Sequence, residues 1–372
     1  MVKHLGFRFL AGVIVGALAA CLSAPAAHAG YLSQLEGMQS SSGVLHQFKY
    51  EGASAATRQN NTGSANVELL TVAGEGGSGS NTVDPDMVPG SGDEIVTPWS
   101  YAAGDVNLIR YEDGFDGPGV SQAYRPQEIM ATSTFAAEVL AQRRSGAGLY
   151  LPSFTTPSMM TVEGVIKPDL YPETGGAGQG GSLHYVFQTR PGTPRGYYLA
   201  QQAPDGSRGV GGTMTAAVGN PFTSFANRPR IVGDYADPEH WYYIAVTYDL
   251  SNTAAPAVIN SWYSDLTTGG PLIQSQTNYA APENIGAGLV GATGLGGVGL
   301  FVRPATATLP ILAQEFFAGW IDNLAIYGDK LTAAQVGRHY RALTIPGVPE
   351  PASAVLLAIG SLAVAACRRR AK

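Results

Sequence analysis

The carboxylates that come closest to a catalytic arrangement are Glu112, Asp113 and Asp116. Hydrolysis of a glycosidic bond needs two carboxyl groups at a fixed separation. These three crowd into Glu-Asp-Gly-Phe-Asp-Gly, which is typical of a turn. The chain also has no His-Glu-x-x-His zinc motif and no Gly-x-Ser-x-Gly nucleophile motif. We therefore expect a protein that is not an enzyme.

Histidine is the other common acid–base residue, but the six histidines are scattered along the chain. His4 and His28 fall within the first 29 residues. The other four are His46, His184, His240 and His339. Because each of these stands alone in the sequence, we expect it to lie at the surface or to pack in the core.

A segment near the C-terminus could itself be a substrate for proteolysis. It begins with Val348, Pro349, Glu350 and Pro351. The two prolines favour the extended backbone that a protease binds. Residues 352–367 follow without a charge over 16 positions, fewer than the roughly 20 that span a bilayer comfortably. The segment ends with the basic residues Arg368, Arg369 and Arg370. Such a basic stop is expected on the cytoplasmic side of a membrane.

In order and spacing, these three parts resemble the PEP-CTERM sorting tail of Gram-negative bacteria. The resemblance implies an exosortase-type membrane protease as a partner and a transient stay in the inner membrane. It also implies that the processed protein reaches the cell surface or the extracellular space. The alternative is that residues 352–367 are an ordinary single-span anchor.

The N-terminus has the order of a secretory signal peptide. Lys3 and Arg8 precede an apolar run at residues 9–22. The residues at the expected cleavage site are Ala27, Ala29 and Gly30. Small residues at these positions predict cleavage after Ala29, which would remove residues 1–29.

The two cysteines, Cys21 and Cys367, both lie in these terminal segments. Cys21 ends Leu-Ala-Ala-Cys, which resembles a lipobox, so lipidation of Cys21 is the alternative to cleavage after Ala29. No cysteine is left between the ends, so a disulfide bond cannot stabilise the exported part. Its stability must come from a packed core, with or without a metal ion.

The exported part is strongly acidic. The whole chain has 22 basic and 28 acidic residues, and six of the basic residues lie in the two ends, which leaves 16 against 28 and a net charge of about −12. This balance disfavours nucleic acid and anionic lipid as partners. It fits a neutral polysaccharide, a cation-bridged matrix or high solubility.

Short runs rich in Val, Ile, Tyr, Phe and Thr alternate with clusters of Gly, Asn, Pro and Ser. This pattern is typical of many short antiparallel strands joined by turns. We expect strands at residues 44–50, 106–111, 183–188, 197–201, 241–248, 258–263 and 320–327. The composition of residues 71–91 and 173–182 predicts flexible loops, and neither has the Lys-Ser/Thr ending of a phosphate-binding loop.

Two stretches of the second half carry a family resemblance. Residues 241–249 and 259–265 form an expected hairpin in which Trp241 opens a strand ending in Thr-Tyr-Asp, and residues 316–327 contain Gly-Trp-Ile-Asp. Both resemble strands of laminin-G-like, concanavalin A-like domains. A short helix normally follows the second strand in these domains. Here Thr332 and Gln335 predict a capping box, Leu331 can staple to Val336, and Pro346 ends the helix.

We therefore predict an all-β fold, an antiparallel two-sheet jelly-roll sandwich with one short C-terminal helix. Helices are also expected in the signal peptide and in the hydrophobic tail. The predicted organisation is a signal peptide at 1–29, a laminin-G-like domain with Gly-rich loop insertions at 30–345, and a sorting tail at 346–372. In the first half, residues 46–51 resemble an opening strand and residues 133–139 an outer-sheet strand.

The resemblance makes calcium a candidate cofactor. Asp322 occupies the Asp of the Gly-x-Ile-Asp strand, and Glu51 on the opening strand is its expected partner. The alternative is that Asp322 hydrogen-bonds nearby backbone and orders the end of its strand.

Aromatic residues on the expected strands are candidates for stacking on sugar rings; they are Tyr197, Tyr242, Trp262 and Tyr263. Packing in the core is the more common fate of such residues. We therefore expect a non-catalytic module that binds an extracellular polysaccharide or a matrix protein. The alternative is a polysaccharide-degrading hydrolase or lyase of the same fold.

Overall fold

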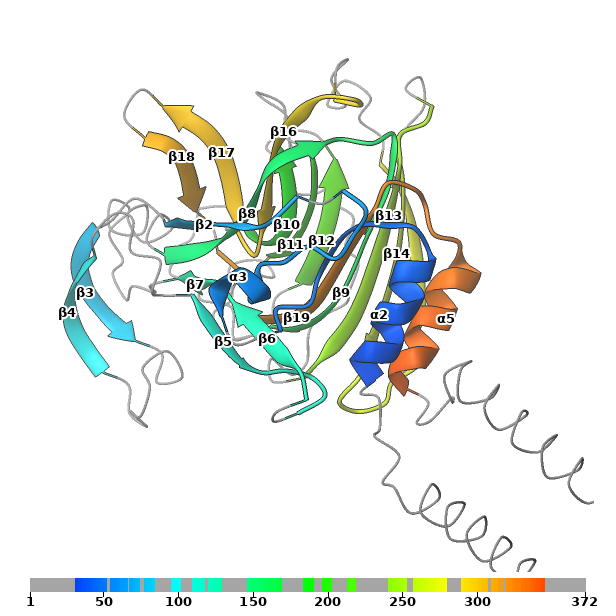
Figure 1. Ribbon diagram of the computed structural model, residues 1–372, viewed down its shortest axis with the longest axis horizontal. Helices are drawn as coiled ribbons and strands as arrows, with labels where there is room; N and C mark the ends of the chain where they lie inside the picture. The colour runs from blue at the N-terminus through cyan, green and yellow to red at the C-terminus, as the bar shows by residue number, and fades with distance from the viewer. Residues whose placement is uncertain are drawn as a thin grey trace, which may run out of the picture.

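A computed structural model describes residues 31–51, 54–65, 67–73, 77–83, 95–101, 109–117, 120–128, 146–168, 183–190, 196–202, 213–218, 240–252, 257–279, 289–306, 309–314, 316–317 and 319–344. Within these residues, two antiparallel sheets form the body of the protein (Figure 1).

The first sheet, sheet A, carries the hairpin and the final strand that the sequence predicts. Its strands in order are β15 (Ile273–Tyr279), β14 (Ala257–Asp265), β13 (Tyr242–Asp249), β9 (Met159–Pro168), β19 (Gly319–Tyr327), β6 (Gln122–Arg125) and β5 (Arg110–Asp113). The opening strand β1 (Val44–Phe48) pairs with the second half of β19, whereas β6 meets its first half. Segments from both halves of the chain therefore complete one sheet.

The second sheet, sheet B, faces the first. Its strands in order are β12 (Thr213–Val218), β11 (Tyr197–Gln202), β10 (Leu183–Arg190), β16 (Thr293–Val298), β8 (Gly146–Thr155) and β2 (Leu70–Ala73), and β7 (Gln127–Glu128) pairs with β8. Two further hairpins are formed by β3 (Gly77–Val83) with β4 (Ile95–Tyr101) and by β17 (Phe301–Thr306) with β18 (Leu309–Gln314).

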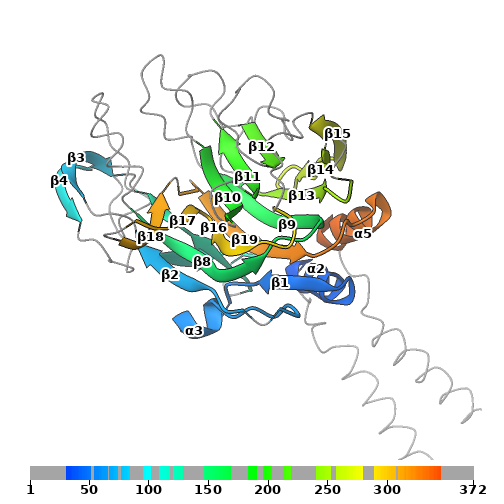
Figure 2. The same ribbon diagram turned by 90° about the horizontal axis from the view of Figure 1, so that it is seen from above.

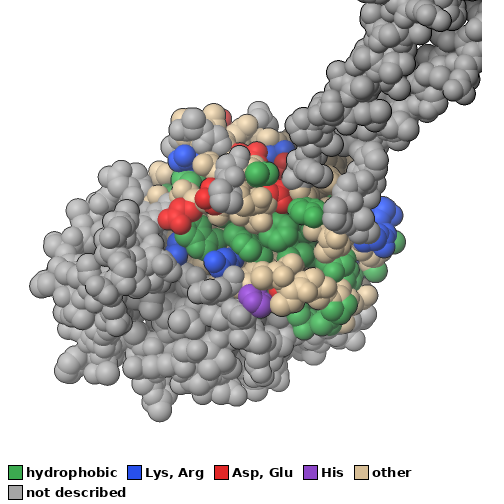
Figure 3. All heavy atoms as spheres, turned by 90° about the horizontal axis from the view of Figure 1, so that it is seen from below, with side chains coloured by type: hydrophobic (Ala, Val, Ile, Leu, Met, Phe, Trp, Pro, Cys, Tyr) green, Lys and Arg blue, Asp and Glu red, His purple; other side chains and the backbone are tan. Residues whose placement is uncertain are grey.

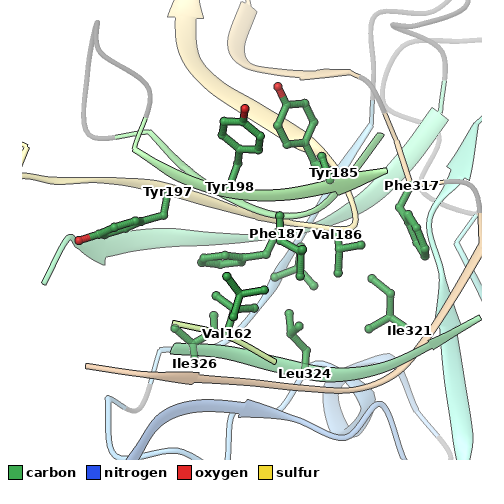
Figure 4. Close-up of a cluster of buried hydrophobic side chains, with 14 of the residues drawn as sticks. Val162, Tyr185, Val186, Phe187, Tyr197, Tyr198, Phe317, Ile321, Leu324 and Ile326 are labelled. Atoms are coloured by element: carbon green, nitrogen blue, oxygen red, sulfur yellow. The ribbon is translucent and has the colours of Figure 1, made fainter. Parts of the chain in front are cut away.

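The core lies between the two sheets. Figure 4 shows Val162, Leu324 and Ile326 of sheet A facing Val186 and Phe187 of sheet B. Strand alternation explains why Leu324 and Ile326 share one face of β19. Val186 and Phe187 are neighbours on β10, and they lie where the pairing of β10 with β11 shifts its register between Tyr185 and Phe187. Burying one such side chain stabilises the fold by about 1.5–3 kcal/mol, and truncating Phe187 to alanine would cost about 3–5 kcal/mol.

Two helices cover the outer face of sheet A. Helix α2 (Tyr31–Ser41) and helix α5 (Ala333–Thr344) pack against each other, with Leu35 and Val336 buried in one cluster beneath them (Figure 2). A third helix, α3 (Ala55–Arg58), is a single turn. In Figure 1, the beginning of α2 and the end of α5 lie together at the lower end of the molecule.

The structure confirms the predicted fold class and the details of the C-terminal helix. The backbone N–H of Thr332 donates to Gln335 Oε1 at 2.9 Å, and the backbone N–H of Gln335 donates to Thr332 Oγ1 at 3.3 Å. Leu331 and Val336 share one buried cluster, as the expected staple requires. No sequence pattern predicted α2, which is an addition to the predicted fold.

The expected loop at residues 71–91 is wrong in part, because β2 ends within it and β3 lies inside it. Backbone groups pair across β3 and β4 whatever the side chains are, so a Gly- and Ser-rich composition does not exclude a strand. The predictions for residues 133–139 and 173–182 and for the two terminal helices lie outside the described residues. Among the residues that the structure does describe, no helix is long and apolar enough to cross a membrane.

Candidate functional site

Asp322 lies where β19 bulges, and it holds the turn between β5 and β6 in place. The pairing register of β19 with β9 shifts between Ile321 and Asn323, and Asp322 is only 2% exposed. Its Oδ2 accepts hydrogen bonds from the backbone N–H of Phe115 and from Ser121 Oγ, the second at 3.1 Å. A side chain at Gly114 would collide with this carboxylate. Asp322 therefore orders this turn from β19, the strand that pairs with β6.

The same turn caps helix α2. Asp116 Oδ2 accepts a hydrogen bond from the backbone N–H of Leu32 at 3.0 Å. The first turn of α2 has no acidic residue of its own, and the first N–H groups of a helix lack partners within it. A carboxylate at this position satisfies one of these groups and interacts favourably with the helix dipole. The cap therefore comes from a residue 84 positions away in the sequence.

Four carboxyl groups near this turn all have pKa values above their ordinary ones. Burial raises the pKa of Asp322 well above its ordinary value, and burial also raises the pKa of Asp116, Glu36 and Glu51. The charges of Asp116 and Glu36 raise the pKa of Asp322 further. Lys49 opposes the shift at Glu36, because its Nζ lies 2.8 Å from Glu36 Oε2. This region of the protein therefore takes up protons more readily than free carboxylates do.

These carboxylates do not assemble a recognisable metal site. Calcium needs six to eight oxygen ligands, and Asp322 already uses one oxygen to hold the turn. Glu51 lies three residues beyond the end of β1, and its side chain is exposed although neighbouring groups partly desolvate its carboxyl group. Among the described residues, no three His, Cys, Asp or Glu side chains are grouped so that they could hold a metal ion. Calcium at Asp322 and Glu51 stays a prediction, and the observed role of Asp322 is the ordering of backbone.

A second polar cluster lies beneath α5, around the buried carboxylate of Glu163 on β9. This carboxylate accepts hydrogen bonds from Tyr243 Oη and Tyr327 Oη, each at 2.8 Å, and His339 Nδ1 lies 3.0 Å from it. His339 Nε2 lies 3.1 Å from Ser42 Oγ. Burial, followed by the charge of Glu163, raises the pKa of both tyrosines.

The position of this cluster excludes contact with a substrate. Glu163 is 0% exposed and His339 is 1% exposed, so a bound molecule could not reach them. The partners of Glu163 come from β13, β19 and α5, and the cluster therefore ties helix α5 to sheet A. Buried polar groups of this kind stabilise a fold when every member has a partner.

Half-exposed apolar side chains reach the surface beside these clusters. We call them the aromatic rim; they are Tyr31, Phe115, Trp241, Leu266, Leu272 and Tyr340. The ring of Phe115 lies 6.4 Å from that of Tyr31 and 6.2 Å from that of Trp241. Figure 3 shows hydrophobic side chains gathered on the face seen from below. Because Tyr31 begins α2, the rim lies at the end of the molecule where α2 starts and α5 stops.

Three of the four aromatic residues considered for sugar stacking are not open to a ligand. Tyr197, Tyr242 and Trp262 are 0%, 5% and 3% exposed, respectively. Tyr263 is partly buried and packs against the core between the sheets. The expectation that such residues pack in the core is confirmed. The aromatic rim was missed, because its members come from five separate segments that no sequence pattern connects.

Three of the four histidines pack in the core or lie near the surface, as expected, and each has a polar partner that is distant in the sequence. His46 is buried, bonds to Asn61, and has its pKa lowered by burial to about 4. His240 Nδ1 lies 2.8 Å from Asp265 Oδ2, and His339 contacts Glu163. The side chain of His184 is not among those that the structure describes. For His339, the sequence did contain a signal: Glu163 is the single charged residue of the apolar stretch Met-Met-Thr-Val-Glu-Gly-Val-Ile, which indicates a buried carboxylate that needs a partner.

No protein-family model matches this chain, and no curated protein matches it either. Similar solved structures include the botulinum neurotoxin type G receptor-binding domain, at 10% identity and a TM-score of 0.39, over 80% of this chain and 51% of that one. A carbohydrate-binding module of the Dit protein of Lactobacillus casei BL23 phage J-1 matches at 9% identity and a TM-score of 0.33, over 78% of this chain and 96% of that one. Trypanosoma rangeli sialidase matches at 10% identity and a TM-score of 0.37, over 84% of this chain and 38% of that one. The chain thus spans about half of the neurotoxin domain that it resembles.

Proposed function

We propose that this chain is an exported surface or extracellular-matrix protein whose sandwich binds carbohydrate or another protein without catalysis. The signal peptide at 1–29 would direct export, and an exosortase-type protease of the inner membrane would remove the tail at 346–372. The proposal includes the assignment of residues 30–345 to the laminin-G-like domains.

The observation that carries the proposal is the position of the two ends of the described chain. Helices α2 and α5 bring Tyr31 and Thr344 to the same end of the molecule (Figure 1). The seven residues 345–351 separate α5 from the apolar segment and span at most about 25 Å. A domain tethered by this tail would therefore turn its aromatic rim toward the bilayer, and removal of the tail would make the rim accessible.

The assignment of a binding role rests on where the polar and aromatic groups lie. The buried carboxylates Glu163 and Asp322 already hold α5 and the turn at Asp116. Half-exposed aromatic rings such as Trp241 and Tyr340 offer the large apolar surfaces on which ligands bind. A non-catalytic contact at the aromatic rim is the simplest function of this arrangement.

Export is tested in a strain that lacks the sorting protease. We expect the full-length, tail-bearing protein to accumulate at the inner membrane, whereas the parent strain releases a form without residues 346–372. Mass spectrometry of the mature ends would locate both cleavage sites and would distinguish cleavage after Ala29 from lipidation at Cys21. Unchanged release from the mutant strain would contradict the proposed sorting.

Binding is tested with a glycan array and an assay for released reducing sugar. We expect saturable binding without sugar release, and loss of that binding on Trp241→Ala. The matched control is Val290→Ala, because Val290 is 39% exposed and is not part of the rim. Release of oligosaccharides would establish the alternative, a polysaccharide-degrading enzyme.

A further inference from the structure

The two outermost strands of sheet A differ in how well their outer edges are protected against pairing with another strand. Among the described residues, β5 forms one edge of this sheet and β15 forms the other. An edge strand presents unpaired backbone N–H and C=O groups, which can pair with another chain. Proteins usually protect such edges with charged side chains, with proline, or by covering them.

The β5 edge has this protection. Its four residues, Arg-Tyr-Glu-Asp, include three charged side chains, and Glu112 and Asp113 are exposed. The guanidinium of Arg58 at the end of α3 lies 4.6 Å from the ring centre of Tyr111. A second strand approaching β5 would have to bury these charges, which is unfavourable.

Within the part of the chain that the structure describes, the β15 edge lacks such protection. Its seven residues, Ile-Gln-Ser-Gln-Thr-Asn-Tyr, include no charge, no proline and no glycine. Among the described strands it pairs with β14 alone, and Figure 2 shows it at the periphery of the molecule. Ile273, at its start, is 43% exposed.

We infer that β15 pairs edge to edge with β15 of a second copy of this chain, antiparallel and about a two-fold axis. Such a closed pairing joins the two sheets A into one continuous sheet. Two copies of an acidic protein approach each other most easily along a neutral strand, and β15 is neutral over its whole length. The pairing goes beyond the proposed function and does not depend on the ligand.

The chemistry of the strand suits pairing with itself. Gln276 is the central residue of β15 and lies opposite Asn260 in the register with β14. A symmetric antiparallel pair that overlaps fully places Gln276 opposite its own copy. The glutamine amide carries both donors and an acceptor, so two copies can hydrogen-bond to each other.

Disulfide trapping in the full chain tests this pairing directly. In a background with Cys21→Ser and Cys367→Ser, Gln276→Cys would bring two thiols together, because opposed residues of antiparallel strands lie about 4.5–5.5 Å apart, within the range that a disulfide bridges. We expect a covalent dimer to form about a hundredfold faster than in the control Glu112→Cys, since pairing raises the local thiol concentration to about millimolar. Equal rates for the two variants, or no dimer with Gln276→Cys, would overturn the inference.

A second variant tests the same edge without cysteine chemistry. Gln276→Lys places two ammonium groups opposite each other, and sedimentation of the full chain in detergent should change from dimer to monomer. Edge strands tolerate lysine, so the variant should keep its β-rich circular dichroism spectrum. A monomeric parent protein, or a dimer that survives Gln276→Lys, would show that β15 is not the interface.

Discussion

Helices α2 and α5 lie side by side on the outer face of sheet A, but different interactions hold them there. The N-terminus of α5 is capped by Thr332, directly before the helix, and its His339 contacts the buried Glu163. The N-terminus of α2 is capped by Asp116 of a distant turn. Its buried Gln39 donates from Nε2 to Asn323 Oδ1 at 2.8 Å.

The difference separates a helix that its own sequence specifies from one that the rest of the fold specifies. Helix α5 has a local cap and a regular apolar face, whereas α2 buries Glu36 and Gln39 beside its leucines. The polar residues of α2 are favourable only because Lys49, Gln47 and Asn323 are already in place. We therefore expect α5 to depend on a few strong contacts of its own, and α2 to depend on the turn and on the bulge of β19.

The largest effect is expected from Glu163→Ala, which removes the centre of the α5 cluster. Tyr243, Tyr327 and His339 would each lose a partner in a fully buried region, at a cost of about 3–5 kcal/mol in the free energy of unfolding. Urea denaturation would measure this loss. Tyr243→Phe is the matched control, expected to cost about 1 kcal/mol because the carboxylate keeps its other partners. Equal losses in the two variants would mean that Glu163 is not the centre of the cluster.

The same contrast explains how far the sequence could predict this molecule. The hairpin at β13 and β14, strand β19 and helix α5 follow from local patterns, namely alternation, turn residues and the Thr332–Gln335 box. The cap of α2 by Asp116 and the partnership of Glu163 with His339 depend on contacts between residues 84 and 176 positions apart, respectively. Such contacts arise only when the sheet is assembled, so no window of sequence contains them.

The next effect concerns the pH dependence of stability at the α2 turn. Burial raises the pKa of Asp322 in the folded protein above its unfolded value, so the folded state binds more protons there. The stability from this group is fully present below its unfolded pKa and is lost as the pH rises through its folded pKa. Asp322→Asn keeps an oxygen acceptor but cannot ionise, so the variant should gain stability relative to the parent as the pH rises.

Urea denaturation of both proteins between about pH 5 and about pH 8 would measure this difference. Other groups titrate in the same range, notably His46, whose folded pKa of about 4 makes its contribution fade as the pH falls from its unfolded value. His46 is present in both proteins, so its contribution cancels in the comparison. A stability difference that does not change with pH would contradict the raised pKa of Asp322 in the folded protein.

A smaller effect is expected from Asp116→Ala, which removes the distant cap of α2. The loss should be about 1–2 kcal/mol, with faster hydrogen exchange at Leu32 in the first turn of α2. Asp116→Asn is the control that keeps the acceptor oxygen without the charge. It should restore most of the stability, because burial already disfavours the charged form of Asp116. A larger loss in the asparagine variant than in the alanine variant would show that the cap is not what Asp116 provides.

The smallest effect is expected from Thr332→Ala, the equivalent change at α5. Thr332 and Gln335 are at or near the surface and their hydrogen bonds compete with water, so the cost should be about 0.5–1 kcal/mol. Faster hydrogen exchange should stay within the first turn of α5, because Glu163 and His339 hold the middle of the helix independently of the cap. If exchange in α2 also accelerates, the two helices unfold as one unit. The different interactions that hold them would then not make them independent.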